Sequence, residues 1–161
     1  MVASPGQSGN VTHLFAPDAA ATRALGADVA ARCVPGTCIH LDGELGAGKT
    51  TFARGFLQAL GHKEKVRSPT YTLVESYQTG SGPVFHFDLY RLKAAEELEA
   101  MGFRDYFDGS GICLVEWAQR AESLLGTPDL HVTLQTHGTG RDLDFVAHTP
   151  KGHAALPPAK S

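Results

Sequence analysis

The feature that most constrains the fold of this 161-residue chain is the stretch from Gly43 to Thr50, which reads G-E-L-G-A-G-K-T. It matches G-x-x-x-x-G-K-T, a glycine-rich loop that joins a strand to a helix and cradles phosphates. The glycines let successive backbone N–H groups point at phosphate oxygens, and the helix that follows adds its positive N-terminal end. In this motif Lys49 reaches the β- and γ-phosphates and the Thr50 hydroxyl binds Mg²⁺.

The residues on both sides of the loop have the pattern that the motif requires. Residues 37–41 read as a short strand, and residues 51–60 read as an amphipathic helix with Phe52, Phe56 and Leu60 on one face. We therefore predict a nucleotide-binding loop. Its expected nucleotide contacts are Gly43, Gly46, Ala47, Gly48, Lys49, Thr50 and Thr51.

The order of the remaining elements predicts an α/β protein, a three-layer P-loop NTPase fold with a mixed, largely parallel central sheet. Strands are expected at 11–15, 37–41, 71–77, 84–90, 112–115, 130–136 and 142–148, and helices at 18–33, 51–60, 93–101 and 118–125. We expect one domain over residues 11–149, with a flexible N-terminal tail at 1–10 and a flexible Pro/Ala-rich tail at 150–161.

Two acidic residues are candidates for the carboxylate that orients Mg²⁺. Glu116 ends the apolar run Ile112–Val115, which is typical of a strand buried on both faces, whereas Asp88 lies within an alternating strand. The carboxyl ends of such strands line ligand sites, so both acids are expected near the loop. A solvated strand-end acid at 116 and a surface acid paired with Arg91 at 88 remain as alternatives.

Two further features are candidates for functional roles. Ser68, Pro69 and Thr70 lie between the loop helix and the next strand, where a switch-like segment senses the γ-phosphate in other NTPases, although a simple turn fits equally well. Trp117, the only tryptophan, follows Glu116 and either covers the nucleotide, meets a partner or belongs to the core.

Composition narrows the class of protein. The net charge of −3 does not favour autonomous nucleic-acid binding, and no apolar run reaches the length of a membrane span. Three scattered cysteines favour a cytoplasmic protein with reduced thiols. Because Asn10 is the only asparagine, the N-K-x-D motif for guanine is absent, which favours ATP over GTP.

Four motifs in this order resemble those of the TsaE (YjeE) family, the bacterial P-loop ATPases of tRNA threonylcarbamoyladenosine biosynthesis. The motifs are G-E-L-G-A-G-K-T-T-F from Gly43, S-P-T-Y-T-L-V from Ser68, H-F-D-L-Y-R-L from His86 and L-V-E-W from Leu114. The resemblance extends from about Pro17 to Arg141.

The resemblance implies a Mg²⁺-dependent ATPase that acts with TsaB and TsaD, meets tRNA only indirectly and does not itself transfer the threonylcarbamoyl group. By position, Lys49 would hold phosphates, Thr50 and Glu116 the Mg²⁺, and Asp88 would be an essential second acid near the γ-phosphate. Ser68–Thr70 would be the switch-like loop, Trp117 a functional tryptophan, and Arg141 a nucleotide contact. A non-hydrolysing nucleotide module and a small kinase are the alternatives.

Overall fold

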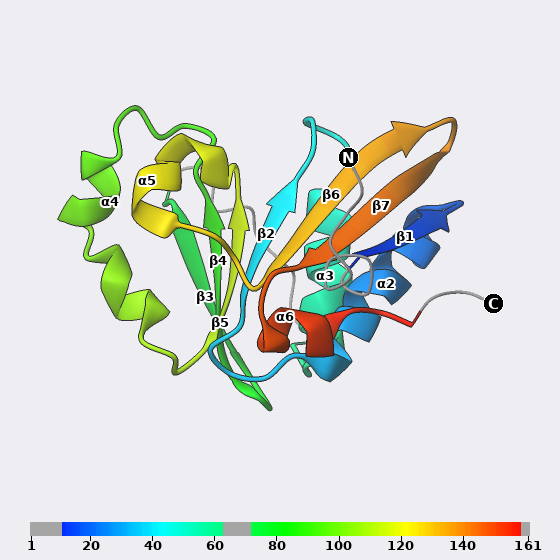
Figure 1. The fold of residues 1–161 in the computed structure, drawn as a ribbon, viewed down its shortest axis with the longest axis horizontal. Helices are drawn as coiled ribbons and strands as arrows, with labels where there is room; N and C mark the ends of the chain where they lie inside the picture. The colour runs from blue at the N-terminus through cyan, green and yellow to red at the C-terminus, as the bar shows by residue number, and fades with distance from the viewer. Residues whose placement is uncertain (1–10, 63–71, 159–161) are drawn as a thin grey trace.

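The computed structural model describes residues 11–62 and 72–158. A single seven-stranded sheet with the order β1-β7-β6-β2-β5-β4-β3 runs through the molecule (Figure 1). The strands are β1 (Val11–Ala16), β2 (Cys38–Asp42), β3 (Val74–Thr79), β4 (Gly82–Asp88), β5 (Ile112–Glu116), β6 (Leu130–His137) and β7 (Gly140–Ala147).

The centre of the sheet is parallel and its edges are antiparallel. Strands β6, β2, β5 and β4 pair in parallel, while β1 with β7, β7 with β6, and β3 with β4 are antiparallel pairs. The predicted mixed α/β sheet is thus confirmed. Parallel strands place their carboxyl ends at one edge, so β2, β4 and β5 all end where the P-loop begins.

Alternate residues of the central strands enter different cores. Ile112 and Leu114 of β5 belong to the core beneath helices α2 (Ala19–Arg32) and α3 (Lys49–Ala59), whereas Cys113 and Val115 belong to a second core. The second core is closed by α4 (Glu96–Ala100) and the 3₁₀ helices η1 (Phe103–Phe107) and η2 (Ala118–Ala121). Because strand side chains alternate between faces, the two cores lie on opposite faces of the sheet, which gives the three expected layers.

Helices α2 and α3 cross at unusually close range because each presents a glycine to the other. A Cβ atom added to Gly26 would lie 2.2 Å from the Phe52 carbonyl oxygen, and one added to Gly55 would lie 2.1 Å from the Arg23 carbonyl oxygen. Asp18 begins α2, where its side chain accepts a hydrogen bond from the Ala21 amide. The close glycine contacts between α2 and α3 fix α3, and therefore the loop before it, against the sheet.

The predicted helices after β4 differ in extent from those observed. The expected helix at 93–101 is shorter, since α4 begins only after Ala95. Ahead of it, the Lys93 and Ala94 amides donate hydrogen bonds to the Glu97 carboxylate, at 2.7 and 2.9 Å. The expected helix at 118–125 is the turn η2 followed by α5 (Glu122–Leu125). These differences leave the ends of β4 and β5 unchanged.

The prediction of a flexible tail from residue 150 is wrong for residues 150–155, because these residues form helix α6 (Pro150–Ala155). Thr149 caps this helix by accepting a hydrogen bond from the Gly152 amide, and its hydroxyl donates to Asp129 at 2.6 Å. Ala155 is fully buried in the core beneath α2. The expected N-terminal tail lies outside the described residues. Within the described ranges no helix has both the length and the apolar character that crossing a membrane requires.

Candidate nucleotide-binding site

The loop between β2 and α3 has the curled backbone that its glycines predict. Gly46 and Gly48 have φ angles of +83° and +104°, in the left-handed region that other residues rarely adopt. A Cβ atom at Gly43 would lie 2.6 Å from the Leu134 carbonyl oxygen, so β6 also requires a glycine there. Helix α3 begins directly after Gly48, and its first amides face the loop.

Lys49 is the centre of the site. Its side chain is 5% exposed, and its Nζ atom donates a hydrogen bond to the Gly43 carbonyl oxygen at 2.6 Å. The same atom lies 3.9 Å from Glu116 Oε1 and 4.2 Å from the centre of the Trp117 ring. A carbonyl, a carboxylate and an indole therefore hold this buried ammonium group in the structure.

The two candidate acids are direct neighbours in the sheet. Asp88 ends β4 opposite Glu116 at the end of β5, and the two residues are 8% and 5% exposed. Their burial argues against both surface alternatives. Burial raises the pKa of Asp88, the hydrogen bond from the Tyr90 amide lowers it, and the charge of Glu116 raises it again, for a net increase.

A histidine that the sequence analysis did not single out contacts Glu116. His86 lies two residues before Asp88 on the same face of β4, and it is fully buried. Its Nε2 atom lies 2.6 Å from Glu116 Oε2. The other carboxylate oxygen, Oε1, faces Lys49. The signal that could have found His86 was its spacing of two from Asp88 in a strand that ends at the site.

Trp117 adopts a left-handed backbone conformation, with φ of +59°, which is rare for a residue other than glycine. Its ring centre lies 4.9 Å from that of Tyr90, and Arg120 lies over both rings, 5.5 Å from Tyr90 and 5.9 Å from Trp117. The turn after β5 thus places the indole beside the loop, where it also packs against the edge of the second core. Tyr90 and Arg120 were also missed by sequence reasoning.

A cleft of about 430 Å³ lies at the N-terminus of α3, and Tyr90 and Trp117 are among the residues that line it. Most of the predicted site residues meet in this cleft: Gly46, Gly48, Lys49, Thr50, Thr51, Asp88, Glu116, Trp117 and Arg141. Gly43 and Ala47 instead line a second hollow of about 440 Å³ on the other side of the loop. The structure thus divides the predicted loop contacts between two adjoining spaces.

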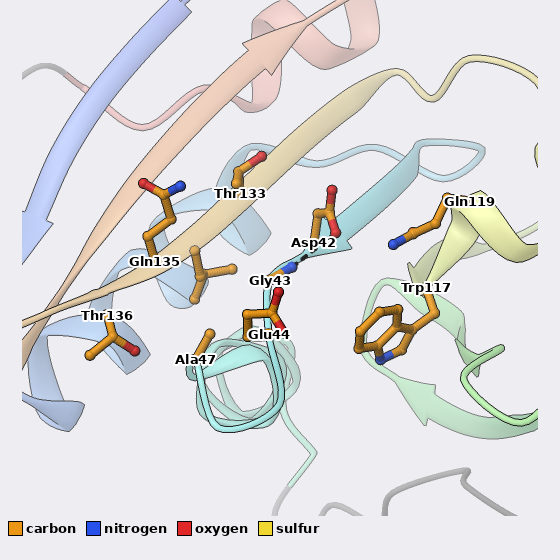
Figure 2. A pocket seen from close by; sticks show the side chains of 10 residues that line it. Asp42, Gly43, Glu44, Ala47, Trp117, Gln119, Thr133, Gln135 and Thr136 are labelled. Carbon is orange, nitrogen blue, oxygen red and sulfur yellow. Dashed lines mark hydrogen bonds between the residues drawn. The ribbon is translucent and has the colours of Figure 1, made fainter.

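Figure 2 shows the second hollow, with the Trp117 indole and the polar side chains of β6 on two sides of the loop residues Gly43 and Glu44. Trp117 lines both spaces, so its ring forms the boundary between them. Besides the acids Asp42 and Glu44, the polar side chains at this hollow are those of Gln119, Thr133, Gln135 and Thr136. No sequence motif had indicated them.

Arg141 contacts the loop itself. Its Nε atom donates to the Ala47 carbonyl oxygen at 3.0 Å, and Nη2 donates to the Gly46 carbonyl oxygen at 3.2 Å. Its Nη1 atom donates to the Gly140 carbonyl oxygen at 2.7 Å, which ties the guanidinium to the start of β7. Arg141 therefore braces the outer turn of the loop while it lines the cleft.

The donor set fits a Mg²⁺ ion held jointly with phosphate oxygens. Within residues 11–62 and 72–158, no three His, Cys, Asp or Glu side chains gather in a way that could hold a metal on their own. Thr50 and Glu116 supply one hydroxyl and one buried carboxylate at the same cleft. This matches the usual preference of Mg²⁺ for few protein ligands together with phosphate and water. The predicted switch-like residues Ser68, Pro69 and Thr70 lie outside the described residues.

Comparison with known proteins identifies the family. The model of the threonylcarbamoyl adenosine biosynthesis protein TsaE matches residues 16–143. A Haemophilus influenzae protein named tRNA threonylcarbamoyladenosine biosynthesis protein TsaE is 47% identical over 114 residues, 71% of this chain and 72% of that protein. A Bacillus subtilis protein of the same name is 41% identical over 127 residues, 78% of this chain and 79% of its own length.

A solved structure agrees with these matches. The crystal structure of Bacillus subtilis YdiB superposes with a TM-score of 0.76 at 31% identity and covers 90% of both chains. The matched region spans the loop, both acids and Trp117. This chain belongs to the TsaE family of tRNA threonylcarbamoyladenosine biosynthesis proteins.

Proposed function

We propose that this protein is a Mg²⁺-dependent ATPase that supports threonylcarbamoyladenosine formation on tRNA together with TsaB and TsaD. The observation that carries the proposal is the meeting of Lys49, Thr50, Asp88 and Glu116 in one cleft at the N-terminus of α3. A phosphate chain suits this cleft because it offers the helix N-terminus, a curled glycine loop and a buried ammonium group.

Each residue of the cleft has a distinct part in this proposal. When phosphate binds, Lys49 exchanges the Gly43 carbonyl oxygen and the Trp117 ring for phosphate oxygens. The Thr50 hydroxyl and Glu116 would hold Mg²⁺, and the bound ion would supply positive charge that offsets the charge of the phosphates. Glu116 is suited to this because its Oε1 atom already faces the ammonium group of Lys49.

Asp88 is the residue that we assign to water. It lies beside Glu116 at the end of the neighbouring strand, and its raised pKa makes it a better proton acceptor than an ordinary aspartate. Its Oδ1 atom accepts the Tyr90 amide hydrogen, which fixes the carboxylate. Asp88 would orient an attacking water molecule and accept its proton as the water oxygen bonds to the γ-phosphorus. The bond from the γ-phosphorus to the bridging oxygen breaks in the same reaction, and ADP leaves.

We infer that partners complete the catalytic set, because Arg141, which lines the cleft together with Arg91, is engaged with the loop. Arg141, the arginine bonded to the loop, donates to the Gly46 and Ala47 carbonyl oxygens. An arginine that stabilises the transition state is worth about 10³–10⁵ in rate. Slow hydrolysis by the isolated chain and faster hydrolysis with TsaB and TsaD are therefore expected.

Phosphate release from ATP, measured with Mg²⁺ and with or without TsaB and TsaD, tests this function. Lys49→Ala and Glu116→Ala should each lower release by about 100-fold or more, as loss of a transition-state contact does. Lys151→Ala, an exposed lysine of α6, is the matched control and should leave release unchanged. ATP binding without release under all conditions would favour a non-hydrolysing module. Phosphate transfer to a small acceptor would favour a kinase.

A further inference from the structure

The carboxylate of Glu116 contacts His86, the first residue of the H-F-D-L-Y-R-L motif, for which the family resemblance implied no role. His86 is fully buried in β4, and its Nε2 atom lies 2.6 Å from Glu116 Oε2. Strand pairing fixes this contact, because His86 pairs with Leu114 while Asp88 pairs with Glu116 in the β4–β5 register. Both side chains project from the same face of the sheet.

The two oxygens of Glu116 therefore have different surroundings. Oε2 is held by His86 inside the core, and Oε1 faces the cleft 3.9 Å from Lys49 Nζ. A carboxylate that binds Mg²⁺ is ionised and only accepts hydrogen bonds, so its contact with His86 requires Nε2 to carry the hydrogen and donate it. Within the described part of the chain, the other ring nitrogen, Nδ1, is buried without a hydrogen-bond partner.

We propose that His86 is a positioning residue that locks the Glu116 carboxylate with Oε1 directed at the P-loop, so that Glu116 is preorganised for Mg²⁺. This inference rests on the proposed function, because it assigns Glu116 to the metal. Without the bond to His86, the glutamate could rotate about its side-chain torsions, and binding Mg²⁺ would carry the cost of ordering it. Hydrogen-bond partners of metal ligands typically change metal affinity by about 10- to 100-fold.

The test compares nucleotide affinity with Mg²⁺ and with EDTA for three variants at one position. His86→Gln keeps an N–H donor at about the position of Nε2. The shorter side chain of His86→Asn cannot bring its donor within reach of Glu116 Oε2. His86→Phe keeps a ring that has no donor. Wild type and His86→Gln should bind ATP more tightly with Mg²⁺ than with EDTA. His86→Asn and His86→Phe should lose about 10- to 100-fold of that gain and keep the EDTA affinity.

A double-mutant cycle shows whether His86 acts through Glu116. In a Glu116→Gln background, His86→Phe should cause no further loss of the Mg²⁺-dependent gain, because the ligand that it positions is gone. Suppose that Mg²⁺ increases the ATP affinity of the wild type and increases that of His86→Phe and His86→Asn by the same factor. This inference is then overturned, and the proposed function stands. If the wild type does not bind ATP at all, the proposed function fails and the inference fails with it.

A spectroscopic measurement on the unaltered protein keeps the inference testable even if the variants do not fold. Nitrogen-15 NMR of the His86 ring in the nucleotide-free protein should show the Nε2–H form, with a proton that exchanges slowly with water because it is buried and bonded. Finding the hydrogen on Nδ1 alone would overturn the inference, since Nε2 would then have nothing to donate to Glu116.

Discussion

Replacing Arg141 by alanine removes the brace from the outer turn of the P-loop. The side chain donates hydrogen bonds to the Ala47 and Gly46 carbonyl oxygens at 3.0 and 3.2 Å. A hydrogen bond from a charged group is worth about 1.5–3 kcal/mol, and we count the longer, exposed bond to Gly46 well below that range. The two bonds together then stabilise the loop by about 2–3 kcal/mol.

This energy sets the size of the expected effect on binding. If the loop loses its order in the nucleotide-free variant, ATP must order it again, and the affinity falls by at most about 30- to 150-fold. Trp117 reports binding, because it is the only tryptophan and its ring contacts Lys49. Titrating its fluorescence with ATP measures the affinity. Arg141→Lys is the matched control for charge, and it should recover little, since one ammonium group cannot span both carbonyl oxygens at the geometry of the guanidinium.

Hydrogen exchange separates a brace from a simple nucleotide contact. In the nucleotide-free protein, the Ala47 amide donates to the Glu44 carbonyl oxygen within the loop. Arg141→Ala should speed its exchange by up to the same factor of about 30–150. Unchanged exchange at Ala47 together with weakened ATP binding would refute the brace and favour the direct contact that the family resemblance implied. Near-complete recovery of affinity by Arg141→Lys would also refute it.

Two further changes test the electrostatics of the site and the packing beneath it. Asp88→Asn should raise the midpoint of thermal unfolding at neutral pH while it abolishes phosphate release. The pKa of Asp88 is raised in the folded state, so the stability of the wild type falls as the pH rises from the ordinary aspartate pKa through the raised pKa. The variant has no carboxyl group to ionise at this position. Its gain in stability over the wild type should therefore shrink as the pH is lowered. A variant less stable than the wild type at neutral pH would contradict this sign. Gly55→Ala should lower the free energy of unfolding in urea by about 1–3 kcal/mol, because its Cβ atom would meet the backbone of α2. The exposed Gln58→Ala of the same helix should change it by less than about 0.5 kcal/mol, and equal effects of both would refute the close helix crossing.

The parts of the site that could be predicted from the sequence are those that depend on local pattern. The strand, loop and helix around Lys49 follow from glycine spacing and hydrophobic periodicity. Glu116 follows from its place at the end of a buried strand. The meeting of Asp88 and Glu116 follows from the rule that parallel strands end at one edge of the sheet.

The parts that were missed depend on contacts between distant segments. His86 reads as one alternating residue of a strand, and only the β4–β5 register shows that it meets Glu116. Helix α6 has no hydrophobic periodicity, and it is stabilised where Gly152 packs against the Asp129 backbone. The capping signal of Thr149 followed by a proline was nevertheless present in the sequence and could have indicated the helix.

The measurement that most directly tests the central claim is the amount of threonylcarbamoyladenosine in tRNA from bacterial cells depleted of their own TsaE. Mass spectrometry of tRNA nucleosides gives this amount after the cells receive this chain or its Lys49→Ala variant at equal abundance. The wild-type chain should restore the modification, and Lys49→Ala should not, because its cleft lacks the ammonium group that holds phosphate. Equal restoration by both chains would contradict the account, since the P-loop would then be dispensable for the role of the family.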